Sequence, residues 1–355
     1  MATGQSLHMN HGEGEASYAR NSTFQGAEQN RMRPIIEEAV TGLFKSTKSL
    51  SSVAIADLGC SSGPNALALV SGAVDVIFHH YARQEQVPPE LCVFLNDLPD
   101  NDFNNVAKRL AEFQESGRHI GLVVAGIVPG SFYNRLFPRS SLHLIFASNS
   151  VHWLSEAPED LRNNGIPMYD GDDDLRQARR PLVLEAYARQ FKKDFKVFLN
   201  LRAQEMVPGG QMVISLPGRR ADNNTPLWNP MAFILNDMAI RGVINREKLN
   251  SFYIPLHGPS DEELMEIIKE ESSFKMNKML VHEITSGMDN GSITPRMVGL
   301  TLRAVYEPIM VQHFGKSNQV LEELVRTTER NVIMGSPEVT ASSGFVFICV
   351  SLTKI

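Results

Sequence analysis

The sequence has few cysteines and no long apolar run. Three of its 355 residues are cysteine (Cys60, Cys92 and Cys349), and none lies in a CxxC or Cys/His cluster. The cysteines therefore predict neither a disulfide framework nor a zinc site, and they fit a reducing compartment. No segment approaches the roughly 18 apolar residues that span a bilayer, and the first residues lack the apolar run of a signal peptide. We expect a cytoplasmic protein with no membrane partner.

The chain also lacks an excess of positive charge. Lys and Arg total 34 against 40 Asp and Glu, which gives a formal net charge of -6 and a pI near 6.0. This balance argues against nucleic acid as the partner. With 43% hydrophobic and 21% charged residues, the composition is that of a globular protein. The length exceeds the ~100–200 residues of a typical single core, so we expect an elaborated domain.

Short apolar runs, each followed by a polar turn, alternate with helical periodicity and predict a mainly parallel α/β sheet. Predicted strands cover residues 53–58, 91–96, 121–127, 141–148, 211–216 and 344–352. Predicted helices cover residues 66–80, 102–110, 181–206, 227–242, 261–269, 295–314 and 318–333. Residues 1–30 are predicted to be an irregular arm, with the helical pattern beginning near Pro34. The acidic run 170–174 is predicted to be a solvated loop.

Three predicted strands end in residues suited to a nucleoside. The first is followed by a Gly/Ser-rich turn at 57–65 that begins with Asp57, and the dinucleotide pattern GxGxxG is absent. Asp97 follows the second strand and can accept hydrogen bonds from ribose hydroxyls, or else cap the next helix. Ser131 and Phe132 follow the third, where an aromatic face suits adenine, or else belongs to the core. Ligands of such sheets bind at the carboxyl ends of the strands, so the three ends together favour a nucleoside site.

The fourth predicted strand is followed by Asn149, His152 and Trp153. An indole N–H near a ligand edge is a good donor to a carboxylate. A lone Trp or His is more often a core residue or a hydrogen-bonded surface group. Taken alone, these residues therefore do not indicate a ligand site, and the interpretation depends on the motifs around them.

Together these stretches resemble the plant SABATH family of S-adenosylmethionine-dependent methyltransferases, which methylate small carboxylic acids and, in one branch, xanthine nitrogens. The similarity extends over nearly the whole chain. The matching motifs are HMNHGEGEASYARNSTFQ at 8–25, IADLGCSSGPN at 55–65, FLNDLPDNDFNNV at 94–106, PGSFYNRLFP at 129–138, SNSVHWLSEAPE at 148–159 and VPGGQMVISLPGR at 207–219.

The resemblance implies a role for individual residues. On the cofactor motif fall Tyr18, Cys60, Asn65, Asp97, Leu98, Ser131 and Phe132, with Asp57 opening the turn. Gln25 and Trp153 match the pair that binds the acceptor carboxylate, and Asn149 and His152 fall on variable positions of the acceptor pocket. Asn149 differs from the Tyr of salicylate-type members.

Some family members are described with a magnesium ion near an Asn and a DxFN stretch. The matching stretch here is Asn250, Ser251, Phe252 and Tyr253, with Asn163 as the third party. Both the Asp and the second Asn are replaced. Neutral amide oxygens make a poor magnesium site without a carboxylate.

The resemblance implies a Rossmann-like class I methyltransferase sheet with a mostly helical cap. We predict an arm and helix over the active site at 1–45, a cofactor-binding α/β core at 46–221, a helical cap over the acceptor at 222–340 and a last core strand at 341–355. The implied reaction is attack of a carboxylate oxygen of a benzoate- or salicylate-type acid on the methyl group of S-adenosylmethionine. A carboxylic acid with a pKa near 4 is ionised at neutral pH, so no general base is required.

Several alternatives stay open from the sequence. Jasmonate, anthranilate or indole-3-acetate can replace benzoate as the acid, and xanthine N-methylation is possible within the same family. A nicotinamide-dependent oxidoreductase or a binding protein without turnover belongs to other classes. Members of the family commonly form homodimers, which we also expect here.

Overall fold

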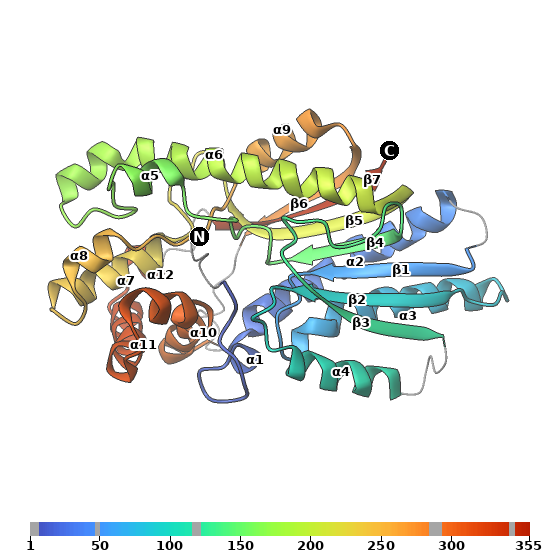
Figure 1. Cartoon of the computed structure of the whole chain (residues 1–355), viewed down its shortest axis with the longest axis horizontal. Helices are drawn as coiled ribbons and strands as arrows, with labels where there is room; N and C mark the ends of the chain where they lie inside the picture. The colour runs from blue at the N-terminus through green and yellow to red at the C-terminus, as the bar shows by residue number, and fades with distance from the viewer. Residues whose placement is uncertain (1–6, 47–49, 116–121, 284–292, 341–344) are drawn as a thin grey trace.

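A seven-stranded mixed sheet runs through the centre of the molecule (Figure 1). The computed structural model describes residues 7–46, 50–115, 122–283, 293–340 and 345–355. Strands β1 to β5 are mutually parallel, and β7 is antiparallel to both β5 and β6. The order across the sheet is β3-β2-β1-β4-β5-β7-β6. The strands are β1 (Ser52–Leu58), β2 (Glu90–Asp97), β3 (Val123–Pro129), β4 (Leu142–Ser148), β5 (Met206–Arg219), β6 (Phe274–Glu283) and β7 (Phe345–Lys354).

Helices cover both faces of this sheet (Figure 1). On one face lie α2 (Thr23–Ser46), α3 (Ala68–Arg83) and α4 (Phe103–Glu115), and on the other lie α6 (Asp173–Glu205) and α9 (Asp261–Glu271). Strand β1 contributes Val53 and Ile55 to one apolar cluster and Ala56 and Leu58 to the other. Side chains alternate across a strand, so a strand buried on both faces has the near-continuous apolar sequence found here.

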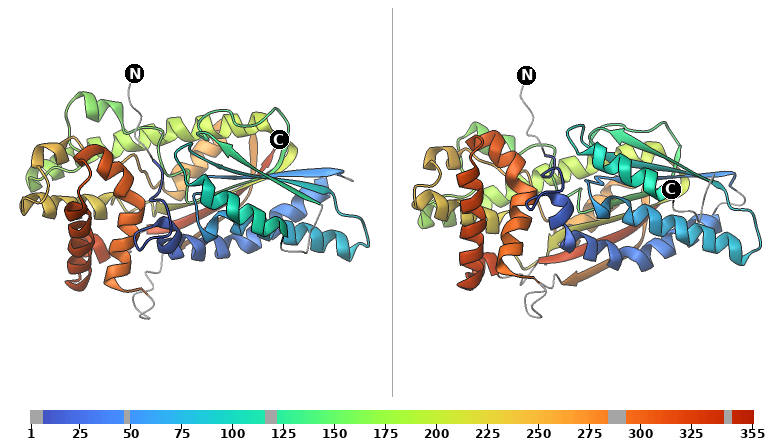
Figure 2. Two further views of the ribbon diagram at one scale, coloured as in Figure 1. Left: turned by 60° about the horizontal axis from the view of Figure 1, so that its bottom comes forward. Right: turned by 90° about the horizontal axis from the view of Figure 1, so that it is seen from below.

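Five further helices, three long and two short, gather beyond one end of the sheet (Figures 1 and 2). They are α7 (Asn229–Ile240), α8 (Arg246–Asn250), α10 (Pro295–Phe314), α11 (Asn318–Ile333) and α12 (Pro337–Thr340). The short helix α1 (Tyr18–Asn21) packs against α10, which brings the N-terminal arm between cap and sheet. Two further short elements, the 3-10 helix η1 (Pro64–Leu67) and α5 (Glu159–Asn163), follow β1 and precede α6 respectively. Among the described helices, none has both the length and the apolar character needed to cross a bilayer.

The α/β fold with its helical cap is as predicted, and six strands fall where the sequence places them. The predicted strand starts at Gly121 and Gly344, and the boundary at 341, lie outside the described residues. Strand β6 is not among the predicted strands. It joins the sheet from within the segment predicted to be a helical cap. This strand lies at the sheet edge, and Lys275, Asn277 and Lys278 interrupt its apolar residues. Such polar residues protect an edge strand from further pairing but obscure its period of two.

Two predictions about helix starts are wrong. Helix α2 begins at Thr23, within the segment predicted to be irregular. Its first turns are polar, so they lack the apolar stripe on which the predicted helix start is based. Helix α6 begins at Asp173 and not at the predicted residue 181, so the acidic run is a loop only as far as Asp172. The Asp172 side chain caps the helix by accepting a hydrogen bond of 2.9 Å from Leu175 N. Asp170 pairs with Arg179 at 2.6 Å. Carboxylates at a helix N-terminus satisfy free N–H groups and favour the helix dipole.

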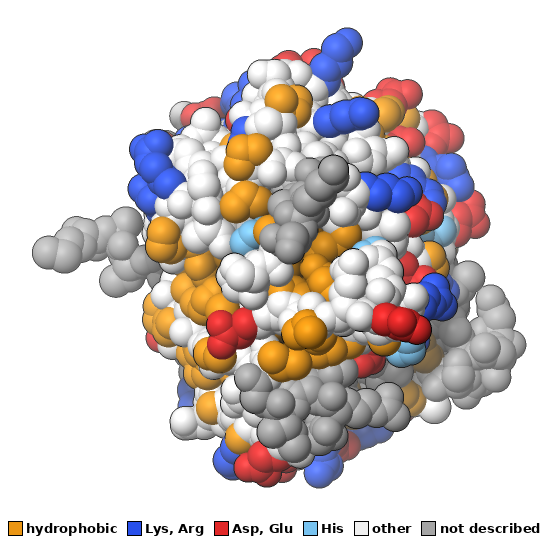
Figure 3. All heavy atoms as spheres, turned by 90° about the vertical axis from the view of Figure 1, so that its right-hand side faces the viewer, with side chains coloured by type: hydrophobic (Ala, Val, Ile, Leu, Met, Phe, Trp, Pro, Cys, Tyr) orange, Lys and Arg blue, Asp and Glu red, His pale blue; other side chains and the backbone are white. Residues whose placement is uncertain are grey.

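The face at the end of the molecule away from the cap carries acidic and basic side chains interspersed with apolar ones (Figure 3). Its described side chains thus show both signs of charge side by side. This mixture is in keeping with the mild overall charge of the sequence.

A fully buried ion pair near the end of α6 holds the loop that follows β3. Arg202 Nε lies 2.8 Å from Glu205 Oε2, and both side chains have an exposed fraction of 0%. Arg202 also donates to the carbonyls of Phe132 and Asn134 at 2.9 and 3.0 Å, and Glu205 accepts from the backbone N–H of Leu136 at 2.7 Å. The loop bearing Phe132 is therefore held by charge-assisted hydrogen bonds from α6.

Replacing Arg202 with Met should be strongly destabilising. The change leaves Glu205 buried without its counter-charge, which costs about 3–5 kcal/mol in the free energy of unfolding. Urea unfolding measures this value. The control is Arg189→Met, which removes exposed pairs with Glu185 and Asp160 and should cost less than about 1 kcal/mol. Equal losses in the two variants would contradict this account of the loop.

Candidate active site

A cavity of about 590 Å³ lies where the parallel strands end, between the sheet, α2 and the cap. The sheet places β1 beside β4 here, and such a reversal of strand order is the usual ligand site of an open α/β sheet. Of the predicted site residues, eleven line the cavity: Tyr18, Gln25, Cys60, Asn65, Asp97, Leu98, Ser131, Phe132, Asn149, His152 and Trp153. Asp57 lies outside the lining, and the three metal candidates do as well.

The turn after β1 is built for close approach of the backbone. Gly59 has φ +80°, and a Cβ there would lie 2.4 Å from Ser150 Cβ. Gly63 has φ +88°, and a Cβ would lie 2.7 Å from the backbone of Ala19 in α1. Only glycine satisfies both the conformation and the space. The two glycines let this turn pack against the β4 loop and the N-terminal arm, which encloses the cavity.

Asp97 occupies the end of β2 with both carboxylate oxygens engaged by backbone N–H groups. Oδ1 accepts from Leu98 N at 2.7 Å and Oδ2 accepts from Ser61 N at 2.6 Å. Asp102, not Asp97, caps α4, since its Oδ1 accepts from Asn105 N. Burial raises the pKa of Asp97 to about 6, although these two hydrogen bonds lower it. Asp97 is thus ionised at neutral pH with lone pairs left for a ligand.

Asp57 lies behind the turn and is buried. Its Oδ2 has no hydrogen-bond partner among the described residues. Burial raises the pKa of Asp57 to about 8, and the nearby charge of Asp97 raises it further. The protonated form of Asp57 is therefore favoured at neutral pH, which leaves Asp97 as the anionic group of this end of the cavity.

Trp153 is held by backbone hydrogen bonds on either side of it. Leu154 N donates to Pro255 O at 2.8 Å, and His257 N donates to His152 O at 2.9 Å, around a bridge that pairs Trp153 with Leu256. The Tyr133 hydroxyl donates to Trp153 O at 2.6 Å. The indole is fixed at the cavity wall by these contacts.

Facing this region, α2 supplies Gln25, whose buried Oε1 has no partner among the described residues. His152 is buried as well, and its Nδ1 also lacks a described partner. Burial lowers the pKa of His152 to about 3, so the imidazole is neutral and a weak base. Asn149 donates to Ser148 Oγ at 3.1 Å. This end of the cavity offers neutral hydrogen-bonding groups.

Sequence reasoning misses several residues of the lining. Gln29 lies one helical turn after Gln25 on the same face of α2, a spacing that the sequence displays once the helix is known to begin at Thr23. No sequence pattern indicates which residues of the cap meet the sheet at the cavity. The cap contributes mainly apolar side chains and one phenol to the lining, among them Leu227, Pro230, Val298, Leu302, Val305 and Tyr306. The centroid of the Tyr306 ring lies 6.0 Å from that of Trp153.

The adjacent Glu28 anchors α2 to the sheet. It has an exposed fraction of 1%, and it contacts Ser215 Oγ of β5 at 3.3 Å and His282 Nε2 of β6 at 2.8 Å. The polar first turns of α2 therefore face a ligand cavity and the Glu28 contacts with β5 and β6 rather than an apolar core. This explains why the apolar stripe begins only near Pro34 while the helix begins earlier.

The proposed magnesium ligands do not fit a cation. Asn163 Nδ2 donates to Glu159 on the surface of α5, Asn250 is exposed, and the Phe252 ring packs against His313 and Phe314. Among the described residues, no group of three or more His, Cys, Asp or Glu side chains is placed to hold a metal.

Where the family pattern has its second Asn, this chain has Tyr253. The Tyr253 hydroxyl donates to Ile166 O at 2.9 Å and lies 3.3 Å from Leu161 O. A phenol thus donates to carbonyl oxygens beside α5 at the position where the family pattern has an amide.

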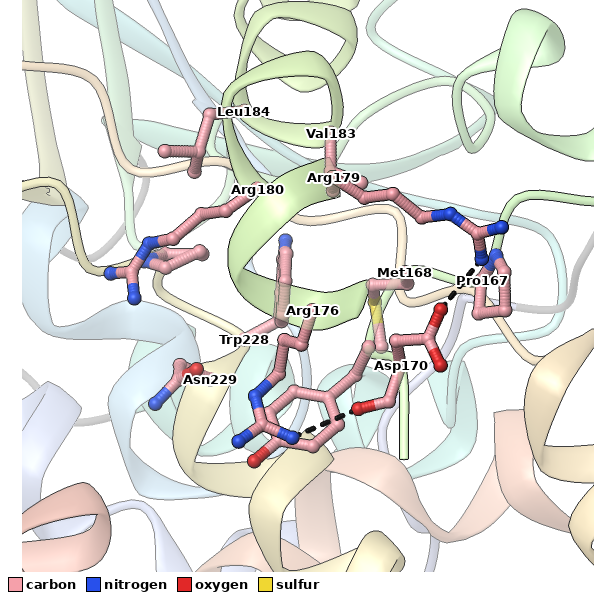
Figure 4. A pocket seen from close by; sticks show the side chains of 12 residues that line it. Pro167, Met168, Asp170, Arg176, Arg179, Arg180, Val183, Leu184, Trp228 and Asn229 are labelled. Atoms are coloured by element: carbon pink, nitrogen blue, oxygen red, sulfur yellow. Dashed lines mark hydrogen bonds and ion pairs between the residues drawn. The ribbon is translucent and has the colours of Figure 1, made fainter. Parts of the chain in front are cut away.

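A second cavity at the start of α6 is only about 40 Å³ in volume. Figure 4 shows three arginines of α6 around it, with Arg179 directed at the Asp170 carboxylate and Arg176 at the Asp170 carbonyl. Arg176 also stacks over Tyr169 at 4.6 Å from the ring centroid, and Arg180 donates to Asn224 O. These contacts join the helix start to neighbouring loops, and the space is too small for a methyl acceptor.

The chain is similar to plant enzymes over almost its full length. It is 37% identical to a jasmonate O-methyltransferase of Arabidopsis thaliana, with 98% of each chain covered. It is 38% identical to a salicylate carboxymethyltransferase of Clarkia breweri, with 88% of this chain and 89% of the relative covered.

The fold is also found in a solved structure of a loganic acid methyltransferase with S-adenosylhomocysteine. The TM-score is 0.83 at 28% identity, and 98% of each chain is covered. The model of the SAM-dependent carboxyl methyltransferase family matches residues 4–355. This chain belongs to the SAM-dependent carboxyl methyltransferases, the family that its motifs resemble.

Proposed function

We propose that this member of the family methylates a small plant acid of the benzoate or salicylate type to its methyl ester. The observation that carries the proposal is the acceptor end of the cavity, where Gln25 and Trp153 stand among mostly apolar side chains. Two neutral donors beside an apolar wall suit a carboxylate joined to a ring. Membership of the family excludes the two alternatives from other classes, a nicotinamide-dependent oxidoreductase and a binding protein without turnover.

The cofactor end is assigned from its chemistry. The ionised Asp97 carboxylate would accept hydrogen bonds from the ribose hydroxyls, and Phe132 would stack on the adenine. Tyr18, Cys60, Asn65, Leu98 and Ser131 would complete the wall, with Asp57 behind the turn as its support. S-adenosylmethionine supplies the methyl group from its sulfonium.

At the acceptor end, this chain orients the carboxylate. Gln25 and Trp153 would each donate to it, and Asn149 and His152 would form the neighbouring wall. His152 has a pKa of about 3 and is unsuited to remove a proton, which an ionised acid does not require. Catalysis then rests on holding the nucleophile in line with the methyl group at roughly 3–3.5 Å while the cap excludes water.

An acid panel with labelled S-adenosylmethionine, read by product mass, tests this function. Benzoate and salicylate should give methyl esters, and jasmonate, anthranilate and indole-3-acetate are the alternative acids. Xanthosine tests N-methylation, for which a purine would need donors at its carbonyls. A methylated purine without any methyl ester would overturn the proposal.

We also propose a cytoplasmic homodimer. The free state of Cys60, Cys92 and Cys349 supports a reducing compartment. Exposed apolar side chains at the ends of α7 and α11, among them Ile240 and Ile333, suit a contact with a second copy.

Replacing Trp153 with Ala should raise the KM for the acid and lower turnover. Loss of a hydrogen bond to a charged group reduces kcat/KM by roughly 10- to 100-fold. Trp153→Phe keeps an aromatic ring without the N–H and should show most of the same loss. Calorimetry with S-adenosylhomocysteine should give wild-type affinity for both variants. Equal loss of acid and cofactor affinity would remove Trp153 from the acceptor site.

Cofactor affinity should fall on acidification. The Asp97 carboxylate is ionised above its pKa of about 6 and protonated below it, so hydrogen bonds from ribose hydroxyls are lost as the pH falls. We expect about tenfold weaker binding of S-adenosylhomocysteine at pH 5 than at pH 7. Calorimetry on Asp97→Asn provides the control, which should bind weakly with little pH dependence. A pH profile that is unchanged in Asp97→Asn would exclude Asp97 as the group that titrates.

Removal of divalent metal should leave the enzyme unchanged. Chelation with EDTA should alter neither methyl ester formation nor the melting temperature, because the Tyr253 hydroxyl satisfies the α5 carbonyls. Tyr253→Phe should instead lower the free energy of unfolding by about 1 kcal/mol through the lost hydrogen bond. A drop in melting temperature on chelation of the wild type, restored by magnesium, would contradict this assignment.

A further inference from the structure

Gln29 is a polar residue of the cavity wall that carboxylate binding does not use. It lies one turn after Gln25 on α2, and both side chains line the cavity. The Gln29 Oε1 atom is buried, and none of the described residues makes a hydrogen bond to it. A buried amide oxygen without a partner is unfavourable. A ligand atom that donates to it would remove that cost.

Gln29 is not required to hold α2 in place. The neighbouring Glu28 does so through Ser215 and His282, which belong to two different strands. Ser215 O in turn accepts from Asn149 N at 2.8 Å, which connects the same anchor to the acceptor wall. Because the helix is fixed by Glu28, the Gln29 amide is held toward the cavity in a defined position.

The chemistry of this amide selects its ligand. An ionised carboxylate has no proton to donate, so it cannot satisfy Gln29 Oε1. Nδ1 of His152 is a second buried polar atom of the wall without a described partner. Residues four apart on a helix have Cβ atoms about 5–6 Å from each other. A carboxylate at Gln25 therefore places the atom that meets Gln29 several bonds away from the carboxyl carbon.

We propose that Gln29 forms a second polar subsite, which selects acids bearing a hydroxyl or amino donor about one helical turn from the carboxylate. The inference rests on the proposed carboxyl methylation and names the substrate class more closely. It distinguishes positional isomers. A hydroxyl ortho to the carboxyl group stays beside Gln25 and Trp153, whereas one at the meta or para position lies across the ring toward Gln29.

The test compares benzoate with 2-, 3- and 4-hydroxybenzoate in the wild type and in Gln29→Met, which matches the side-chain length but has no amide. Affinity is measured by calorimetry in the complex with S-adenosylhomocysteine, and turnover by the mass of the methyl ester. The better of the 3- and 4-hydroxy acids should bind the wild type about tenfold more tightly than benzoate. In Gln29→Met this preference should fall to within about twofold, with benzoate affinity unchanged.

Two controls separate the subsite from other effects. Gln25→Met should weaken all four acids together and leave their ratios intact. Gln29→Glu keeps an acceptor oxygen, so it should retain the preference for the hydroxylated ring even if every acid binds less well. This variant is used in place of Gln29→Met if Gln29→Met fails to fold.

The outcomes are distinct. The subsite is refuted if the wild type shows no preference for either hydroxy acid, if the preference persists in Gln29→Met, or if Gln29→Met loses affinity for S-adenosylhomocysteine instead. The proposed function fails separately if no acid yields a methyl ester, a result that leaves the binding ratios to decide the subsite.

Discussion

The constraint on which this active site depends is the burial of a carboxylate in a cavity whose described lining has no Lys or Arg side chain. Its described lining contains one ionised group, Asp97, which is itself an anion. Burying a second anion is costly unless donors surround it. In the proposed function the lining would meet this need with neutral donors at one end, Gln25 and Trp153, while the sulfonium of the cofactor would supply an opposite charge. The acid is thereby favoured where the cofactor is bound.

Neutral donors act only if they are held in place, and the fold holds them by polar contacts outside the cavity. Glu28 fixes α2 to β5 and β6, so that Gln25 reaches the cavity from a helix tied to the sheet. Arg202 and Glu205 fix the loop that carries Phe132. Buried charged pairs contribute little net stability but are costly to break, which favours one arrangement of the elements that they join.

The sequence predicts most of the sheet and the turn after β1 well because both depend on local chemistry. A strand buried on both faces has an apolar run, and a turn with positive φ at Gly59 requires glycine. The acceptor end is less predictable. Helix α2 begins earlier than its apolar stripe because Gln25, Glu28 and Gln29 face polar surroundings that exist only in the folded chain. Strand β6 and the cap residues depend likewise on partners distant in sequence, and the family resemblance, not periodicity, identifies Gln25 and Trp153 as a pair.

Tyr253 belongs to a segment that supports the Trp153 side of the cavity. Residues 253–257 run alongside residues 152–154 and hold Trp153 through the hydrogen bonds of Leu154 and His257. This segment must itself be fixed. Tyr253 donates to Ile166 O near α5, and the Tyr187 hydroxyl of α6 donates to Ile254 O at 3.0 Å. Two phenols thus join the segment to α6 and to the α5 region. These hydrogen bonds fix the backbone on which the indole of Trp153 is carried.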